Sequence, residues 1–282
     1  MSKLKKAMEK AKIERDFDAD LLKKEPPPSG LSVVSGEKKI ADPVVEGVSV
    51  EYTRTRVQSV DPEVLKRNKI LSLFHEYRET DLLKTLRTQV LNSLEKIGGN
   101  SLLVTSANPG EGKTFISINL GLSIAYELNH TVLIVDADMR NPATGHRNFS
   151  EDFFGLNGNR GLSDYLTGQA EVQDLLINPG INRITVLPAG SPRADSSELL
   201  GSPKMEKLVL EMRERYEERI LIFDTPALLT CTDALVFSPS IDAVLLVVEA
   251  EKTTPGDLKR CLELLEGCTI VGTVFNKAKD TR

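Results

Sequence analysis

The sequence predicts an α/β fold with a doubly wound, mostly parallel sheet. Two observations predict it. Short uninterrupted runs of Val, Ile and Leu are typical of strands buried on both faces, and these runs alternate with stretches of helical periodicity. The expected strands are 102–106, 131–135, 184–187, 220–223, 243–248 and 270–275. The expected helices are 79–96, 113–128, 202–217 and 257–266. This alternation indicates one sheet with helices on both faces.

The composition narrows the class of protein. A net charge of −5 argues against nucleic acid as a partner, because such proteins usually carry a strongly basic face. No apolar run reaches the ~20 residues that cross a bilayer, and the Lys-rich start lacks the hydrophobic core of a secretory signal. Cys231, Cys261 and Cys268 do not have metal-ligand spacing. We therefore expect a reduced, cytoplasmic protein without a zinc site.

The chain divides into two parts of different composition. Residues 1–70 are Lys-rich at the start and contain the Pro26-Pro27-Pro28 run, which breaks helices and stiffens a linker. We expect a partly disordered tail there, either a solvated end or a basic segment that touches an anionic membrane surface. Residues 71–282 are expected to form the folded domain.

A glycine-rich loop between an expected strand and an expected helix carries the sharpest motif. Residues 107–114, Ala-Asn-Pro-Gly-Glu-Gly-Lys-Thr, fit the Walker A pattern of phosphate-binding loops (P-loops). Gly110 and Gly112 let the backbone wrap so that its N–H groups point at an anion. Lys113 would reach the β- and γ-phosphates, and the Thr114 hydroxyl would ligate Mg²⁺. The motif predicts ATP and Mg²⁺ as cofactors, with an ATP-binding set of Asn108, Pro109, Gly110, Glu111, Gly112, Lys113, Thr114 and Phe115.

Two further strands end in carboxylates. Asp224 follows 220–223 and fits a Walker B residue, which holds Mg²⁺ and its waters at the carboxyl edge of the sheet. Asp136, Asp138 and Arg140 follow 131–135 at a spacing of two, which puts them on one face of an extended chain. They could supply metal-directed carboxylates, a proton acceptor and a cation for phosphate. The alternative is a solvated turn with an internal Asp–Arg pair. The expected metal ligands are Thr114, Asp136 and Asp224.

With these motifs the sequence resembles the bacterial tyrosine kinases of capsule and exopolysaccharide loci, which are P-loop NTPases of the partition-ATPase-like superclass. The resemblance rests on the P-loop, the Asp-x-Asp-x-Arg element and the Walker B strand, and covers about 75–280. The stretches 161–166, 187–190 and 197–200 also resemble the family. The Lys-rich start and the ending 275–278 are most similar to the tyrosine autokinases of exopolysaccharide loci with exosortase-type sorting.

The resemblance implies a role for each residue. Asp136 would help to deprotonate the attacking tyrosine, while Asp138 and Asp224 would position Mg²⁺ and its waters. Arg140 would contact phosphate or steady its loop. Asn276, at the end of the last strand, would contact adenine. The catalytic set is thus Lys113, Asp136, Asp138 and Arg140.

The resemblance also implies partners. The family forms rings through a Glu-x-x-Arg-x-x-Arg helix, for which this chain offers Asp81, Lys84 and Arg87. Many relatives are fused to a transmembrane activator. Here we expect a separate transmembrane polysaccharide co-polymerase that holds the chain at the inner face of the plasma membrane. Two departures from the family pattern are the absence of tyrosine after Tyr216 and the replacement of a second Walker B proline by Ala227.

Three functions follow as hypotheses. The first is an ATP-dependent protein-tyrosine kinase or autokinase that regulates exopolysaccharide chain length or export, with Tyr52, Tyr77 or another protein as acceptor. The second is an ATPase switch without kinase chemistry, like the partition and division-site ATPases. Those carry a second lysine early in the P-loop, where this chain has Asn108. The third is a scaffold whose P-loop is only structural.

Overall fold

The computed structural model describes residues 55–73, 79–127, 129–140, 149–156, 160–216 and 218–279. The expectations for residues 1–54, together with Tyr52 and Tyr77, lie outside the described residues. Among the helices of the described part, none is both long and apolar enough to span a membrane.

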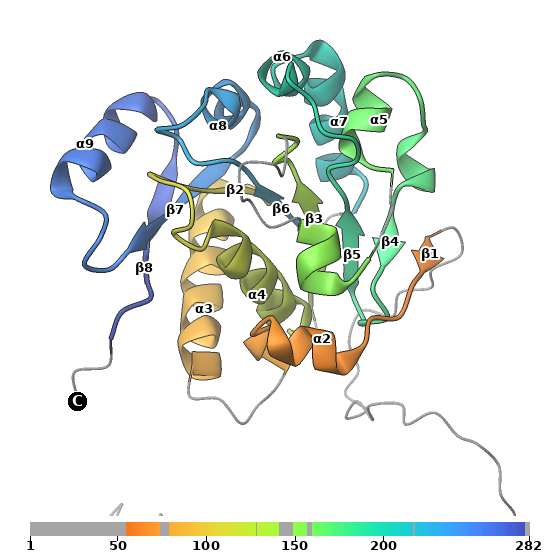
Figure 1. Ribbon diagram of the computed structural model, residues 1–282, viewed down its shortest axis with the longest axis horizontal. Helices are drawn as coiled ribbons and strands as arrows, with labels where there is room; N and C mark the ends of the chain where they lie inside the picture. Colours follow the sequence, from red (N-terminus) through yellow and green to blue (C-terminus); the bar gives the residue numbers. More distant parts are fainter. Residues whose placement is uncertain are drawn as a thin grey trace, which may run out of the picture. The chain divides into compact units, whose positions relative to one another are not determined.

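An eight-stranded sheet forms the centre of the fold, in the order β1-β4-β5-β3-β6-β2-β7-β8 (Figure 1). All neighbouring strands are parallel except β4 and β5. The strands are β1 Arg56–Val57, β2 Ser101–Ser106, β3 Thr131–Asp136, β4 Ile177–Asn178, β5 Ile184–Leu187, β6 Arg219–Asp224, β7 Ala243–Glu249 and β8 Ile270–Asn276. The prediction of a doubly wound, mostly parallel sheet is confirmed.

Helices cover both faces of this sheet and define two hydrophobic cores. Their bounds are α2 Pro62–Arg67, α3 Glu79–Ile97, α4 Lys113–Ala125, α5 Leu162–Leu166, α6 Ser196–Leu200, α7 Pro203–Glu214, α8 Asp233–Phe237 and α9 Pro255–Leu264. One core holds side chains of α2, α3 and α4, such as Leu65, Val90 and Ile118. The other holds side chains of α5, α7, α8 and α9, such as Leu208 and Phe237. Successive side chains of a strand point to opposite faces of the sheet, so the uninterrupted apolar strands contribute to both cores.

The expected elements are present with small shifts at their ends. The helix expected over 113–128 ends at Ala125, and the one expected over 202–217 ends at Glu214. The strands β3 and β6 extend to the carboxylates Asp136 and Asp224. Periodicity locates a helix better than it locates the final turn, which depends on local hydrogen bonds.

Residues 55–70, which we assigned to the tail, join the sheet and the core. β1 pairs with β4 through Arg56 and Ile177. The carboxylate of Asp61 caps α2 by accepting a hydrogen bond from the Glu63 N–H at 2.9 Å. Leu65 and Ile70 are buried in the core beside α4. In the structure this stretch therefore packs with the folded domain, while residues 1–54 of the expected tail lie outside the described residues.

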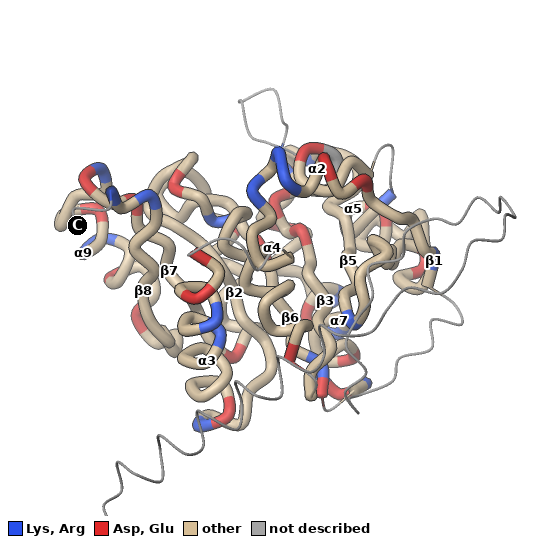
Figure 2. The backbone as a smooth tube through the Cα atoms, turned by 90° about the horizontal axis from the view of Figure 1, so that it is seen from below, with Lys and Arg blue, Asp and Glu red and all other residues tan. Residues whose placement is uncertain are grey.

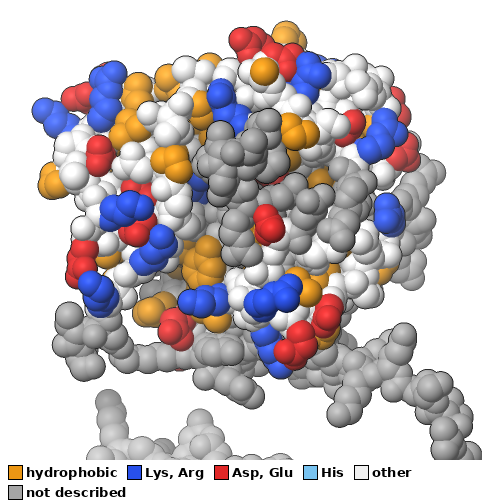
Figure 3. Space-filling model, in the orientation of Figure 1, with side chains coloured by type: hydrophobic (Ala, Val, Ile, Leu, Met, Phe, Trp, Pro, Cys, Tyr) orange, Lys and Arg blue, Asp and Glu red, His pale blue; other side chains and the backbone are white. Residues whose placement is uncertain are grey.

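Charged residues of both signs are interspersed over the described surface. Figure 2 shows charged residues of both signs on α3 and α9. On the face seen in Figure 3, basic and acidic side chains are likewise mixed.

Candidate nucleotide-binding site

The P-loop connects the carboxyl end of β2 to the start of α4. Gly110 and Gly112 have φ angles of 79° and 100°, in the left-handed region that favours glycine. Gly112 is the N-cap of α4, so the first turn of this helix points its N–H groups and its partial positive charge at the loop. Lys113 is buried at 6% exposure. The loop thus has the conformation that its glycines predicted.

The end of β8 holds this loop from outside. The Asn276 amide donates to the Glu111 carbonyl at 2.8 Å, and the Lys277 ammonium donates to the Gly110 carbonyl at 2.7 Å. A Cβ on Gly112 would collide with the Asn276 amide. Asn276 therefore lies against the P-loop, and its adenine contact stays a prediction. The sequence analysis included Lys277 only in the 275–278 ending and did not predict its contact with the P-loop.

Glu111 is fully buried and joins the loop to the segment between β7 and α9. Its carboxylate accepts a hydrogen bond from the Thr253 hydroxyl at 2.6 Å and one from the Asn108 amide at 3.3 Å. The side chains of Asn108 and Glu111 thus support the loop. Thr253 gave no motif in the sequence.

The other two members of the predicted ATP-binding set differ in burial. Phe115 packs against the core on the α4 side. Pro109 is exposed at the tip of the loop. Their contacts with nucleotide stay predictions.

Asp224 accepts hydrogen bonds from two hydroxyl groups of α4. Thr114 donates to one carboxylate oxygen at 2.6 Å, and Ser117 donates to the other at 3.0 Å. Burial raises the pKa of Asp224 to about 6, against the opposing effects of Lys113 and the Thr114 hydroxyl. This is the geometry expected of a Walker B carboxylate beside the metal-binding Thr of the P-loop.

Asp136 lies directly opposite Asp224 in the pairing of β3 with β6. Burial raises its pKa well above the usual range, and the carboxylates of Asp224 and Asp138 raise it further, while the Asp138 N–H and Lys113 lower it. The Asp138 N–H donates to the Asp136 carboxylate at 3.1 Å. Two buried carboxylates in register next to a buried lysine form a site that a cation would stabilise.

The donor set fits Mg²⁺. This ion prefers oxygen ligands and binds through one or two carboxylates together with phosphate and water. Thr114 and Asp224 already touch, and Asp136 is adjacent in the sheet. These three residues would hold the ion.

Arg140 has an ion-pair partner, Asp233, that the sequence analysis did not predict. Its guanidinium forms an ion pair with the buried carboxylate of Asp233 at 2.5 Å. Of the two roles implied by the resemblance, this contact favours the steadying of the loop. Asp233 stands at the start of α8, where nothing in the sequence marked it.

The three candidate ring residues on α3 have partners within the molecule. Asp81 and Lys84 pair with each other at 2.9 Å on the exposed face. Arg87 donates to the Ser123 carbonyl of α4 at 2.9 Å and lies 3.7 Å from Glu127. Arg87 therefore ties α3 to α4, while Asp81 and Lys84 stay accessible.

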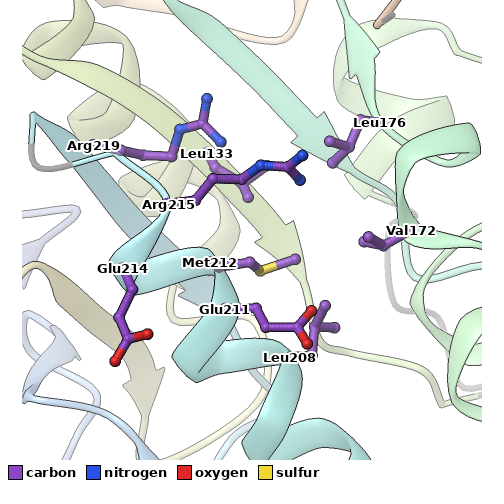
Figure 4. Close-up of a pocket in the computed structure, with 9 residues that line it drawn as sticks. All are labelled: Leu133, Val172, Leu176, Leu208, Glu211, Met212, Glu214, Arg215 and Arg219. Carbon is purple, nitrogen blue, oxygen red and sulfur yellow. The ribbon is translucent and has the colours of Figure 1, made fainter.

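A separate cavity of about 430 Å³ lies far from the P-loop (Figure 4). Arg219, at the amino-terminal end of β6, lines it, whereas Asp224 is at the carboxyl-terminal end of the same strand. Val172 and Leu176 face Met212 of α7 across the cavity in Figure 4. It is distinct from the nucleotide site.

Together the strand order, the P-loop and the paired carboxylates define a P-loop nucleotide-binding domain. A family model described as an AAA domain matches residues 101–268, and the chain belongs to this family. Its relatives include bacterial tyrosine kinases, as the motifs predicted. The chain is 31% identical over 198 residues to the tyrosine-protein kinase etk of Escherichia coli K12, covering 70% of this chain and 26% of that protein.

A shorter relative matches over most of its length. CapB of Staphylococcus aureus, whose naming as a tyrosine-protein kinase is itself provisional, is 29% identical over 200 residues. The match covers 70% of this chain and 84% of that protein. By contrast, the chain spans about a quarter of the length of the first relatives it matches.

Solved structures agree with this placement. The kinase domain of the Escherichia coli tyrosine kinase ETK superposes with a TM-score of 0.67 at 27% identity, over 80% of this chain and 92% of that one. The septum site-determining protein MinD from Pyrococcus horikoshii, solved with Mg-ADP, gives 0.53 at 22% identity, over 65% of this chain and 72% of that one. The second likeness shows the fold alone.

Proposed function

We propose that the chain is an ATP-dependent protein-tyrosine kinase that regulates exopolysaccharide chain length or export. The observation that carries the proposal is the register of β3 and β6, which brings Asp136 and Asp224 together beside Thr114 and Lys113. The P-loop and the Walker B carboxylate account for the binding of Mg·ATP. The second buried carboxylate gives the site a proton acceptor as well.

The residues divide the chemistry between them. The P-loop N–H groups and Lys113 bind the phosphates and offset charge that develops on the transferred group. Bound Mg²⁺ would neutralise phosphate charge and fix the geometry of the phosphates. Asp136 accepts the proton of the tyrosine hydroxyl as that oxygen bonds to the γ-phosphorus and ADP leaves. Burial, together with the neighbouring carboxylates, raises the pKa of Asp136 above that of a free carboxyl group, which makes it a stronger proton acceptor.

The partners of the full system are part of the same proposal. The relative etk is about four times longer than the matched segment, whereas CapB is close to the size of this domain. We propose that a separate transmembrane polysaccharide co-polymerase holds the chain at the inner face of the plasma membrane. Ring assembly would use Asp81 and Lys84, which are accessible on α3.

The test is a phosphotyrosine assay on the purified chain. It is incubated with Mg·ATP, with and without a Glu/Tyr copolymer as acceptor, and phosphotyrosine is mapped by mass spectrometry while phosphate release is followed. Lys113→Met is the inactive variant, and Lys207→Met, at an exposed lysine of α7 outside the P-loop, is the matched control.

Kinase chemistry predicts phosphotyrosine in wild type and Lys207→Met, with none in Lys113→Met. Steady phosphate release with no phosphotyrosine, on the chain or on the copolymer, would instead support an ATPase switch. Failure to bind ATP analogues at all would leave only a structural P-loop.

A further inference from the structure

A buried carboxylate outside the predicted motifs, Asp233, lies in the second core at the start of α8. Its side chain has 0% exposure. The Arg140 guanidinium approaches it at 2.5 Å through Nη2 and donates a second hydrogen bond through Nε at 3.2 Å. The hydroxyls of Ser196 and Ser197 each donate to it at 2.6 Å. Both carboxylate oxygens of Asp233 therefore accept hydrogen bonds.

These contacts join three elements at one point. Arg140 belongs to the segment that leaves β3, Ser196 and Ser197 begin α6, and Asp233 begins α8. Ser197 also hydrogen-bonds Thr232, at 2.9 Å, so the two helix starts are held to each other as well as to the carboxylate. Asp233 is the residue that all three elements share.

The segment held in this way carries the catalytic carboxylates. The Ala137 N–H donates to the Asp224 carbonyl at 2.8 Å, which fixes the start of the segment. Met139 is buried, and its carbonyl accepts a hydrogen bond from the Arg193 N–H at 2.7 Å. One residue further along, the ion pair of Arg140 with Asp233 holds the segment at a third point.

The charge of Asp233 is maintained by its partners. Burial by itself would raise the pKa of Asp233, but the hydrogen bonds from Arg140, Ser196 and Ser197 together hold it below the ordinary value. The ionised carboxylate accepts two hydrogen bonds from a planar guanidinium, which fixes direction as well as distance. An amide keeps the shape of this side chain but loses the charge and one acceptor atom.

We propose that Asp233 is a positioning residue for phosphoryl transfer: it orients Arg140 and thereby fixes the segment that carries Asp136 and Asp138. The inference rests on the proposed function. Because the P-loop binds the phosphates, we expect the loss of Asp233 to change kcat more than KM for ATP.

The test compares Asp233→Asn with a matched variant of a nearby exposed pair. Arg193 and Asp195 form an ion pair at 2.7 Å on the surface of the same region, and Asp195→Asn removes a carboxylate in the same way. For Asp233→Asn we expect kcat to fall about 10- to 100-fold with KM for ATP within about twofold, because small misplacements of reacting groups act on the chemical step. Asp195→Asn should match wild type in both.

A double-variant comparison separates positioning from mere structural support. In Asp233→Asn the unpaired Arg140 guanidinium is 38% exposed, so this variant should fold. Arg140→Gln alone leaves the buried Asp233 carboxylate unpaired, whereas Arg140→Gln together with Asp233→Asn removes both charges and leaves no lone buried ion. If Asp233 acts through Arg140, the double variant has the same kcat as Arg140→Gln. A further loss of tenfold or more would overturn the proposal, as would an unchanged kcat in Asp233→Asn.

The same reactions keep this inference distinct from the proposed function. Phosphotyrosine and phosphate release are both measured in every variant. If wild type releases phosphate but makes no phosphotyrosine, the kinase proposal fails, while the kcat comparison on phosphate release still decides the role of Asp233.

Discussion

Gly112 meets two demands at once. Its φ of 100° lies in the left-handed region, and the amide of Asn276 occupies the space where a Cβ would be. Any side chain here would have to strain the backbone and push Asn276 off the Glu111 carbonyl. The close approach of β8 to the P-loop thus depends on this glycine.

We expect Gly112→Ala to lose ATP binding by about tenfold or more, because it displaces the loop from the geometry that presents its N–H groups. The measurement is the affinity for an ATP analogue by titration calorimetry. Gly98→Ala is the control, since Gly98 has a φ of 63° and nothing near its missing Cβ. It should lower the free energy of unfolding by about 1 kcal/mol and leave binding unchanged. Equal binding losses in both variants would refute the role of the Asn276 contact.

The carboxylate of Asp224 makes magnesium binding sensitive to mildly acidic pH. Its pKa of about 6 means that protons compete with the cation below that pH. The apparent affinity for Mg·ADP should therefore be nearly constant above about pH 7 and fall by up to about tenfold per unit below about pH 6. Binding of ADP without Mg²⁺, measured at the same pH values, corrects for titration of the nucleotide itself. Identical pH profiles with and without Mg²⁺ would contradict this assignment.

At the scale of elements, the segment between β7 and α9 supports the P-loop through Thr253. Its hydroxyl donates to the buried Glu111 carboxylate at 2.6 Å. Thr253→Val keeps the shape and removes the donor, which leaves a buried carboxylate with one fewer partner at a penalty of about 1 to 3 kcal/mol. We expect a lower free energy of unfolding by that amount and a weaker affinity for ATP. Thr254→Val, at the exposed N-cap of α9, is the neighbouring control and should leave ATP affinity unchanged.

The helix α2 gives an element-scale test of where the domain begins. Leu65 is 5% exposed and packs in the core with α4. Leu65→Ala should lower the free energy of unfolding by about 2 to 5 kcal/mol, measured by urea denaturation. Val57→Ala, at a side chain that is 58% exposed on β1, should change it little. A negligible effect of Leu65→Ala would show that this stretch contributes little to the stability of the domain.

The elements that sequence reasoning found and missed differ in physical character. Strands such as β7 are uninterrupted apolar runs, and such runs identify a strand that is buried on both faces. β1 and β4 have two residues each and carry no such signal. The start of α2 did carry one, an Asp–Pro–Glu sequence at 61–63 that is typical of a helix N-terminus. The proline-rich composition before it outweighed that local signal.

The residues of the candidate site also differ in whether the sequence could predict them. The P-loop and the strand-end carboxylates have fixed spacings because phosphate and metal geometry impose them. Asp233, Thr253 and Lys277 act through contacts between segments far apart in the chain. One sequence cannot show such contacts, because no local spacing encodes them.

For the whole molecule, the α3 contacts bear on how copies would assemble. Arg87 is bonded to α4 inside the molecule, whereas Asp81 and Lys84 are exposed. Arg87→Ala should lower the free energy of unfolding by about 1 to 3 kcal/mol, since it removes a charged donor from the Ser123 carbonyl. Lys84→Ala should leave stability nearly unchanged and reduce any self-association seen by light scattering. A loss of association in Arg87→Ala without loss of stability would place Arg87 in the interface instead.

The contacts of β8 with the P-loop also reduce the conformational entropy that the loop loses when a phosphate ligand binds. In a trans peptide the carbonyl and the N–H point in opposite directions, so anchoring the Gly110 and Glu111 carbonyls to Lys277 and Asn276 also aims the N–H groups of the next residues inward. The cradle is oriented before any phosphate arrives. Little conformational freedom is then lost on association, and the rate of capture should be set by diffusion and desolvation, not by rearrangement of the loop.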